Sequence, residues 1–266
     1  MTNKKWKLVW SDEFDYSGLP DPKKWNREVG RIRNQELQYY TENQRKNARV
    51  EDHRLIIEAH RENCEDAQYT SASLVTLGKQ SWLYGRLEAR AKLPSARGVW
   101  PAFWTLGENI ESVDWPACGE IDILEFVGHE PSPTGIYGNI HYGKTTHHAF
   151  CKPRDLSNYD KKPSTEALQF HSKGFHLMPD ATTAFHVYAV EWYPDHIDFF
   201  VDDQCYLTYS KSDSVDGSWP FDKPHYLTLN LAIGGNWGGE KGVDETAFPQ
   251  RYEIDYVRVY QTINKS

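Results

Sequence analysis

Residues 119–127 read Gly-Glu-Ile-Asp-Ile-Leu-Glu-Phe-Val, an apolar β-type run that carries three carboxylates. Charge in such a run needs a reason, because Glu and Asp usually lie on solvated surfaces. Side chains alternate faces along a strand, so Glu120 and Asp122 share a face, while Glu125, five residues after Glu120, should point the other way. One extra residue in a β-bulge between Asp122 and Glu125 would return all three to one face. The run therefore predicts a bulged strand with clustered carboxylates.

Clustered carboxylates on a strand predict acid-base chemistry on a sugar. A retaining glycosidase needs two carboxyl groups roughly 5 Å apart, one as nucleophile and one as proton donor, and side chains of such a strand reach that spacing. The alternative is a solvated acidic face without a catalytic role. The tight spacing of the three acids and the adjacent Trp115 favour the catalytic interpretation.

Aromatic residues support a carbohydrate ligand. The chain has 10 Trp, 16 Tyr and 11 Phe, an aromatic share of 14% against 39% hydrophobic residues. Sugar rings present flat faces of CH groups, which pack on such rings. Trp100 and Trp104 are four residues apart and share a face if their segment is extended, and Trp115 precedes the acidic run, where it would floor the subsite of the reacting sugar. Core packing is the alternative for each of them.

The whole chain predicts an all-β fold. Short runs rich in β-branched and aromatic residues, bounded by Gly, Pro, Asn or Asp, follow one another, and helical periodicity is nearly absent. This pattern favours an antiparallel two-sheet β-sandwich or jelly roll, with residues 1–266 as a single domain because no repeat or linker interrupts them. The runs are Lys7–Trp10, Leu55–His60, Ser71–Leu77, Gly85–Leu93, Gly119–Val127, Gly138–Tyr142, His186–Trp192, Ile197–Val201, His225–Leu231 and Tyr252–Tyr260.

Charge and composition exclude several kinds of partner. A net charge of -8 argues against nucleic acid and anionic membrane surfaces and, weakly, against sulfated polysaccharides. No stretch of about 18 apolar residues is present, so no membrane span is expected. Four cysteines (Cys64, Cys118, Cys151 and Cys205) could pair in three ways, and we expect at most one disulfide, with free buried thiols as the alternative.

The motif Glu-x-Asp-x-x-Glu, in the setting Trp115-Pro-Ala-Cys-Gly-Glu-Ile-Asp-Ile123, resembles the signature of glycoside hydrolase family 16, in its bulged, laminarinase-like branch. Lichenase-like members have one residue fewer in the motif. The resemblance runs from about Trp6 to Tyr260 and implies a concanavalin A-like jelly roll with a concave substrate cleft. The order of residues in the family implies Glu120 as nucleophile and Glu125 as general acid/base, with Asp122 holding Glu120; spacing alone does not assign these roles.

The same resemblance implies the residues that bind substrate. Asn34 would bond the sugars on the non-reducing side, and Trp100 and Trp104 would line the donor side. Arg90 would point to the same concave face, and His141 would bond the acid/base or the leaving sugar. A lone strand His is otherwise most often structural. Asn236 and Trp237 belong to a glycine-rich loop, residues 234–239, that would approach the ligand or merely form a turn.

A structural calcium ion is a further implication of the resemblance. Asp255 matches a calcium ligand of many family members, joined there by backbone carbonyls near Glu13 and at the turn of residues 52–54, which contains His53. Calcium accepts such oxygens readily. Many relatives have Gly in place of His53, so the turn geometry is open. No cofactor is expected for catalysis.

These observations predict a monomeric endo-β-1,3-glucanase that cleaves laminarin-type β-glucans with retention. Mixed-linkage β-1,3-1,4-glucan and agar-type galactan remain alternative substrates, and a lectin-like module without catalysis is an alternative of another class. The long polar stretch from Gly143 to Ala184 predicts either a flap over one end of the cleft or a surface insertion. The chain opens without an apolar leader; we expect a secreted or periplasmic protein in mature form, with an intracellular one as the alternative.

Overall fold

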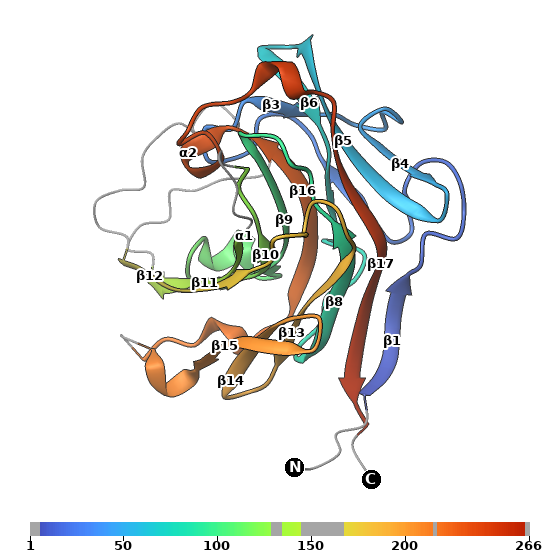
Figure 1. Cartoon of the computed structure of the whole chain (residues 1–266). Helices are drawn as coiled ribbons and strands as arrows, with labels where there is room; N and C mark the ends of the chain where they lie inside the picture. Colours follow the sequence, from blue (N-terminus) through green and yellow to red (C-terminus); the bar gives the residue numbers. More distant parts are fainter. Residues whose placement is uncertain (1–5, 129–134, 145–167, 215–216, 264–266) are drawn as a thin grey trace.

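The computed structural model describes residues 6–128, 135–144, 168–214 and 217–263. In these residues two β-sheets pack face to face around a shared core, and helices are few and short (Figure 1). The predicted two-sheet β-sandwich is confirmed. None of the helices in these ranges is long and apolar enough to span a membrane.

The larger sheet contains ten strands in the described part of the chain. They are β1 (Trp6–Asp12), β3 (Gln38–Tyr40), β4 (Ala48–Glu51), β5 (Arg54–Cys64), β6 (Ala67–Ser71), β8 (Gly85–Lys92), β13 (His186–Trp192), β14 (His196–Val201), β15 (Gln204–Ser210) and β17 (Gln250–Thr262). Their order is β15-β14-β13-β8-β17-β5-β6-β3, with β1 paired to β17 and β4 to β5. The pairs are antiparallel except β3 with β6, a parallel pair that departs from the predicted all-antiparallel arrangement.

The second sheet has seven described strands and carries the acidic run. Its strands are β2 (Asn26–Glu28), β7 (Ser73–Val75), β9 (Val99–Gly107), β10 (Glu120–Glu125), β11 (Gly135–Lys144), β12 (Leu168–Leu177) and β16 (His225–Ile233). Their order is β12-β11-β10-β9-β16-β7-β2. Short helices connect strands: α1 (Ile110–Val113), α2 (Gly235–Gly238) and the 3-10 turns η2 (Lys211–Asp213), η3 (Pro220–Asp222) and η4 (Glu245–Ala247).

Alternation along the strands decides which side chains enter the core. In β8, Ala89 and Ala91 are fully buried in the core between the sheets, so Arg90 points away from it. In β10, Ile121 and Ile123 are buried in the same core. Glu120 and Asp122 therefore lie on the other face of the seven-stranded sheet, which we call the open face.

Two parts of the chain differ from the sequence-based expectation. The stretch from Gly143 to Ala184 contains none of the predicted β-type runs, yet it includes β12, which pairs with β11 along its whole length. Residues 145–167 of the predicted flap lie outside the described residues. Among the cysteines that are described, Cys64, Cys118 and Cys205 are free thiols, and Cys151 also lies outside the described ranges.

Candidate active site

The acidic run forms β10, and the strand contains the bulge that its parity predicts. Along β9, Asp122 pairs with Trp104 and Leu124 pairs with the next residue, Phe103, so Ile123 is the extra residue. The pairing with β11 shifts in the same place. Ile123 and Leu124 are both fully buried, and Glu125 returns to the open face.

The register of the neighbouring strand sets the surroundings of the three acids. Residues directly opposite each other on antiparallel strands share a face. Along β11 the pairs are Glu120 with His141, Asp122 with Asn139, and Glu125 with Tyr137. Strand β11 therefore supplies the polar partners of the acids on the open face.

Glu120 is held by donors and partly open to solvent. Its side chain is 17% exposed. The indole Nε1 of Trp115 donates a hydrogen bond to Glu120 Oε2 at 2.8 Å, and His141 Nε2 lies 3.8 Å from Oε1. Burial raises the pKa of Glu120 above its usual value, and the positive charge of His141 opposes this rise without cancelling it. The contacts with Trp115 and His141 favour the ionised carboxylate.

Glu125 is more deeply placed and holds a proton more firmly. Its Oε1 accepts a hydrogen bond from Trp100 Nε1 at 3.1 Å, and its Oε2 accepts one from Asn139 Nδ2. Burial, followed by the charge of Asp122, raises the pKa of Glu125 to about 8. At neutral pH this carboxyl is therefore largely protonated and able to donate.

Asp122 and His141 form the centre of the cluster. His141 Nε2 lies 3.2 Å from Asp122 Oδ2. Burial and the charge of Glu120 raise the pKa of Asp122 to about 7. Burial lowers the pKa of His141, but the facing carboxylates, Glu120 first, outweigh it and raise that pKa to about 9. The imidazole is thus positively charged at neutral pH and offsets the acids around it.

The same cluster is the group of described side chains that could hold a metal ion. Ligand atoms of Glu120, Asp122 and His141 lie within 4.8 Å of one another. An ion there would bind Glu120, the carboxylate of this group that is partly open to solvent. The positive charge of His141 already offsets the acids, so their arrangement is explained without an ion.

Two aromatic residues flank Glu125. Trp100 and Trp237 meet edge to face, with ring centroids 5.5 Å apart, and Tyr137 packs on Trp237 at 5.0 Å. Trp104 lies on the same face but is only 6% exposed. Its Nε1 donates to Asn230 Oδ1 at 2.7 Å. Trp100 and Trp237 are therefore the accessible aromatic surface beside the acids, and Trp104 is part of the packed wall beneath.

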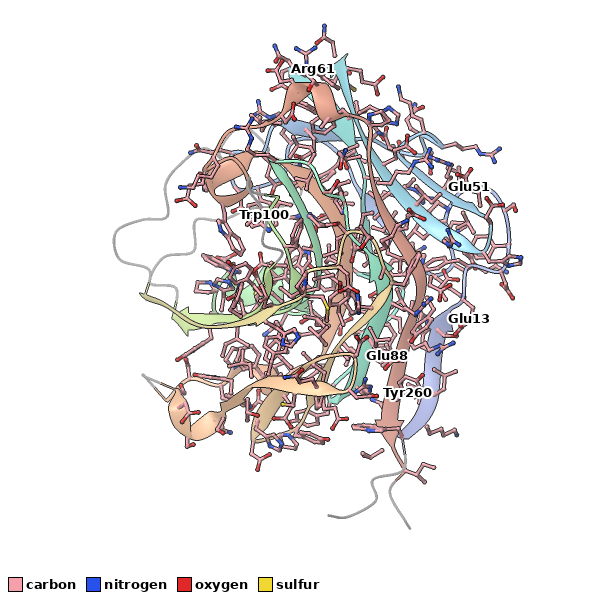
Figure 2. The ribbon with its side chains drawn as sticks, in the orientation of Figure 1. Glu13, Glu51, Arg61, Glu88, Trp100 and Tyr260 are labelled. Carbon is pink, nitrogen blue, oxygen red and sulfur yellow. The ribbon has the colours of Figure 1, made fainter. Side chains whose placement is uncertain are left out.

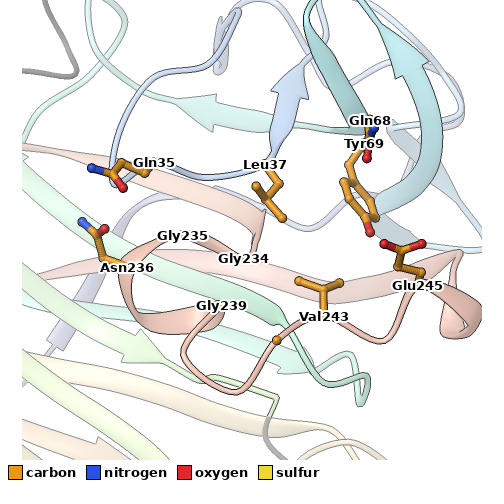
Figure 3. Close-up of a pocket in the computed structure, with 11 residues that line it drawn as sticks. Gln35, Leu37, Gln68, Tyr69, Gly234, Gly235, Asn236, Gly239, Val243 and Glu245 are labelled. Atoms are coloured by element: carbon orange, nitrogen blue, oxygen red, sulfur yellow. The ribbon is translucent and has the colours of Figure 1, made fainter.

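Asn34 and Asn236 come from loops that lie against each other. Both side chains are exposed, and Asn236 N donates to Asn34 O at 2.9 Å. A pocket of about 390 Å³ adjoins Asn236, which Figure 3 shows facing Gln35 across it. Since α2 also carries Trp237, the structure brings Asn34 and Asn236 to the aromatic end of the acidic cluster.

The arrangement combines a bulged Glu-x-Asp-x-x-Glu strand with indole donors on both outer acids. Residues 35–258 of the chain match the model of Glycosyl hydrolases family 16. The chain belongs to this family.

A protein and a solved structure, both from Rhodothermus marinus, are similar to this family 16 glycoside hydrolase. The chain is 48% identical over 267 residues to the beta-glucanase of Rhodothermus marinus, which covers 97% of this chain and 86% of that protein. The X-ray structure of the laminarinase from Rhodothermus marinus superposes with a TM-score of 0.84 at 46% identity, covering 98% of this chain and 100% of that one.

A second similar structure contains a sugar ligand. It is a mutant of SCLam, a non-specific endo-beta-1,3(4)-glucanase from family GH16, co-crystallized with 1,3-beta-D-cellotriosyl-glucose and presenting a 1,3-beta-D-cellobiosyl-glucose at its active site. Its TM-score is 0.79 at 38% identity, with 96% of this chain and 95% of that chain covered.

The predicted position of Arg90 in this hydrolase is wrong. Arg90 lies in β8 of the ten-stranded sheet and points away from the core, on the opposite side from the acids. Its Nη1 donates to Asp255 Oδ2 at 2.6 Å, and its guanidinium lies over the Phe185 ring at 5.0 Å. Alternation along the strand gave its face correctly relative to Ala89 and Ala91, but not the sheet to which the strand belongs.

Of the residues predicted around calcium, Asp255 belongs to β17, and Glu13 lies beside that strand, on the side of the hydrolase away from Trp100 (Figure 2). Arg258 binds both carboxylate oxygens of Glu13, at 2.9 and 2.8 Å, so that side chain is already engaged. Arg90 binds one oxygen of Asp255, and His53 is exposed at the hairpin between β4 and β5. A calcium site here would rest on Asp255 and on backbone carbonyls; it stays a prediction.

The sequence interpretation missed two polar residues of the site. Asn139 donates to Glu125, and Asn230 accepts from Trp104. Asn139 is two residues from His141 on the same strand and therefore shares its face, a signal that alternation offers. Asn230 carries no local signal of this kind, because the register between β16 and β9 brings it to Trp104.

Proposed function

We propose that this family 16 hydrolase is a retaining endo-β-1,3-glucanase that acts on laminarin-type β-glucans. One observation carries the proposal: Glu120 and Glu125 share the open face of one bulged strand, where Trp115 and His141 favour the ionised form of Glu120, and burial with the charge of Asp122 favours the protonated form of Glu125. A nucleophile and an acid in this relation are what a double displacement requires.

In the first step, Glu125 donates its proton to the glycosidic oxygen as that bond breaks, and Glu120 attacks the anomeric carbon to form a covalent glycosyl ester. Asp122 and His141 hold Glu120 from the same face, since His141 contacts both acids. His141 also supplies a positive charge that supports the ionised nucleophile.

In the second step, the ionised Glu125 takes a proton from a water molecule as the oxygen of that water attacks the anomeric carbon of the glycosyl ester. The leaving carboxylate is Glu120, and the product keeps the β configuration because two inversions occur. Trp100 and Asn139 then stabilise the carboxylate form of Glu125 through their N–H donors.

The choice of a neutral β-glucan rests on composition and on similar proteins. A net charge of -8 disfavours sulfated chains. A laminarinase and a beta-glucanase are among the most similar proteins, and one relative binds a β-glucan oligosaccharide. The half-buried Trp100 and Trp237 and the exposed Asn34 and Asn236 would bind successive sugars on the donor side. Because polysaccharides do not cross membranes unaided, we propose that the enzyme acts outside the cytoplasm.

Mixed-linkage β-1,3-1,4-glucan is the second candidate substrate. The observation that favours it is the non-specific endo-beta-1,3(4)-glucanase among the similar structures. A non-catalytic lectin-like role is less well supported, since a binding module has no need for three clustered acids. Agar-type galactan is less well supported than the two glucans, which the names of the similar structures include.

The test is a reducing-sugar assay on laminarin, curdlan, lichenan, agarose and carrageenan, joined to proton NMR of the first product. We expect release from laminarin above the others and a β-anomer before mutarotation. Higher release from lichenan would move the assignment to the mixed-linkage glucan. An initial α-anomer would rule out the covalent mechanism.

A further inference from the structure

A buried carboxylate outside the acidic cluster, Glu36, has no part in the mechanism above. It is 3% exposed and stands two residues before β3. Its Oε2 accepts hydrogen bonds from Gln38 Nε2 at 2.6 Å and from Tyr40 OH at 3.1 Å. Its Oε1 accepts from Asn34 Nδ2 at 3.3 Å. A carboxylate that only accepts is therefore matched to three donors.

The first connection runs from Glu36 to the wall of the acidic site. Tyr40 OH donates to Glu36 and accepts from Asn230 Nδ2 at 3.0 Å. Asn230 Oδ1 in turn accepts from Trp104 Nε1 at 2.7 Å. Trp104 is the cross-strand partner of Asp122. The bonds in this series all donate in the direction from Trp104 toward Glu36, so the series fixes the orientation of the Trp104 ring.

The second connection runs from Glu36 to the glycine-rich loop. Gln38, held by Glu36, accepts from the backbone N–H of Ile233 at 2.7 Å, at the end of β16. Glu36 itself forms an isolated bridge with Gly234. The φ of Gly234 is +68°, and a Cβ there would lie 2.7 Å from Leu37, so the two loops approach as only glycine permits (Figure 3).

The charge of Glu36 is compensated nearby. Burial raises the pKa of Glu36, and the charge of Arg33 lowers it. The Arg33 guanidinium lies over the Trp104 ring at 4.9 Å and pairs with Glu28. The buried acid thus joins Asn34, the glycine-rich loop and Trp104, three parts of the proposed donor side, while it lies behind the surface that a sugar would touch.

We propose that Glu36 is a positioning residue that sets the affinity of the donor side for the β-glucan chain, an inference that rests on the proposed function. It acts through Asn34 and through the loop that carries Asn236 and Trp237. A contact of this kind contributes equally to the binding of the ground state and of the transition state. Its loss therefore raises KM and leaves kcat nearly unchanged.

The experiment compares Glu36→Gln with the unchanged enzyme on laminarin and on short β-1,3-oligosaccharides. Glutamine keeps the size but turns an NH₂ toward the donors of Gln38, Tyr40 or Asn34. We expect KM for long chains to rise about tenfold or more, with kcat within about threefold. The double variant with Asn34→Ala should be little worse than Glu36→Gln alone, because the two residues act as one unit.

The matched control is Glu58→Gln. Glu58 is 5% exposed and bound by Arg49 at 2.7 Å and Arg251 at 2.9 Å, but it lies in β5 of the ten-stranded sheet and contacts neither the glycine-rich loop nor Trp104 through these bonds. Its variant should change thermal stability and leave KM unchanged. Equal KM changes in both variants would make Glu36 merely structural and overturn the proposal.

Two further outcomes keep the inference separate from the function. If Glu36→Gln fails to fold, Tyr40→Phe breaks the same series at its second member, and an unchanged KM there would overturn the proposal. An enzyme that hydrolyses laminarin normally with Glu36→Gln contradicts the inference alone. An unchanged enzyme inactive on every polysaccharide tested contradicts the proposed function instead.

Discussion

Trp100 donates its indole N–H to Glu125 across two adjacent strands, with 3.1 Å between Nε1 and Oε1. The same ring packs against Trp237, so one residue both contacts the proton donor and forms part of the aromatic surface beside it. In the proposed function, Trp100 therefore couples the protonation of Glu125 to the binding of a sugar ring.

Removal of that donor should shift the alkaline limb of the pH profile. The hydrogen bond favours ionised Glu125, so Trp100→Phe should raise its pKa above the value of about 8 and extend activity to higher pH. The profile of kcat/KM between pH 5 and pH 10 measures the limb, which belongs to the coupled group as a whole. An alkaline limb displaced toward lower pH would contradict the role of the Trp100 hydrogen bond. The control is Trp6→Phe, in β1 of the ten-stranded sheet, which should leave the limb in place.

His141→Gln should move the acidic limb instead. The positive imidazole lowers the pKa of Glu120, so its loss raises that pKa, and Glu120 then ionises only at higher pH. The acidic limb should therefore move upward, with kcat/KM lowered by about 10- to 100-fold at neutral pH. His196→Gln, a change of a half-buried residue in β14, should leave the profile in place. An unmoved acidic limb would show that His141 exerts no charge effect on Glu120.

Substitution of either outer acid should abolish hydrolysis in a distinguishable way. Glu120→Ala and Glu125→Ala should each lower kcat by several orders of magnitude with the fold intact. With azide and an activated β-glycoside, the Glu120 variant should give an α-azide and the Glu125 variant a β-azide, identified by NMR. The reverse pattern would exchange the two roles.

Calcium should stabilise the enzyme through Asp255. In millimolar calcium, the unfolding temperature should exceed that in EDTA by about 2–4 °C, or about 1 kcal/mol for a chain of this size. Asp255→Ala should remove the difference. Arg90→Ala breaks the same ion pair but keeps the carboxylate, so it should still respond. Equal melting curves of the unchanged enzyme with calcium and EDTA would dismiss the site.

The insertion between β11 and β12 should influence products more than chemistry. Since residues 168–177 pair with β11, the replacement by a short Gly-Ser linker should be confined to residues 145–167. Hydrolysis of short β-1,3-oligosaccharides should stay within about tenfold, a barrier change of about 1.4 kcal/mol. Chromatography of the laminarin digest should show a changed product pattern. The same pattern before and after replacement would reduce the insertion to a surface decoration.

Local alternation was enough to predict the bulge, because the parity of Glu120, Asp122 and Glu125 depends on neighbouring residues alone. It did not suffice for Arg90, whose strand could join either sheet, since pairing with β13 and β17 is set by residues about 100 and 165 positions further along the chain. Strand β12 was missed because it lies inside a polar stretch, where pairing with β11 rather than local pattern determines it.

The contacts of the site also show how far local sequence patterns predict the structure. Trp100, Trp115 and His141 were expected near the acids and contact them. Asn230 was not predicted, because Trp104 and Tyr40, which it joins, are distant from it in sequence. Glu36 bonds residues close to it in sequence, but its burial and its link to β16 through Gln38 depend on the packing of the loops. Buried polar networks of this kind leave no periodic signature.

The bulge at Ile123 also bears on how this strand can change length. Ile123 and Leu124 both enter the core, so together they occupy the single inward position that an unbulged strand would have between Asp122 and the final glutamate. Loss of one of them keeps every acid on its original side and removes only packing volume. Deletion of one residue at this point therefore keeps the three acids on one face, whereas deletion of one residue elsewhere between Glu120 and Glu125 would turn an acid inward. The catalytic strand thus has one place where evolution or design can alter its length without relocating its chemistry.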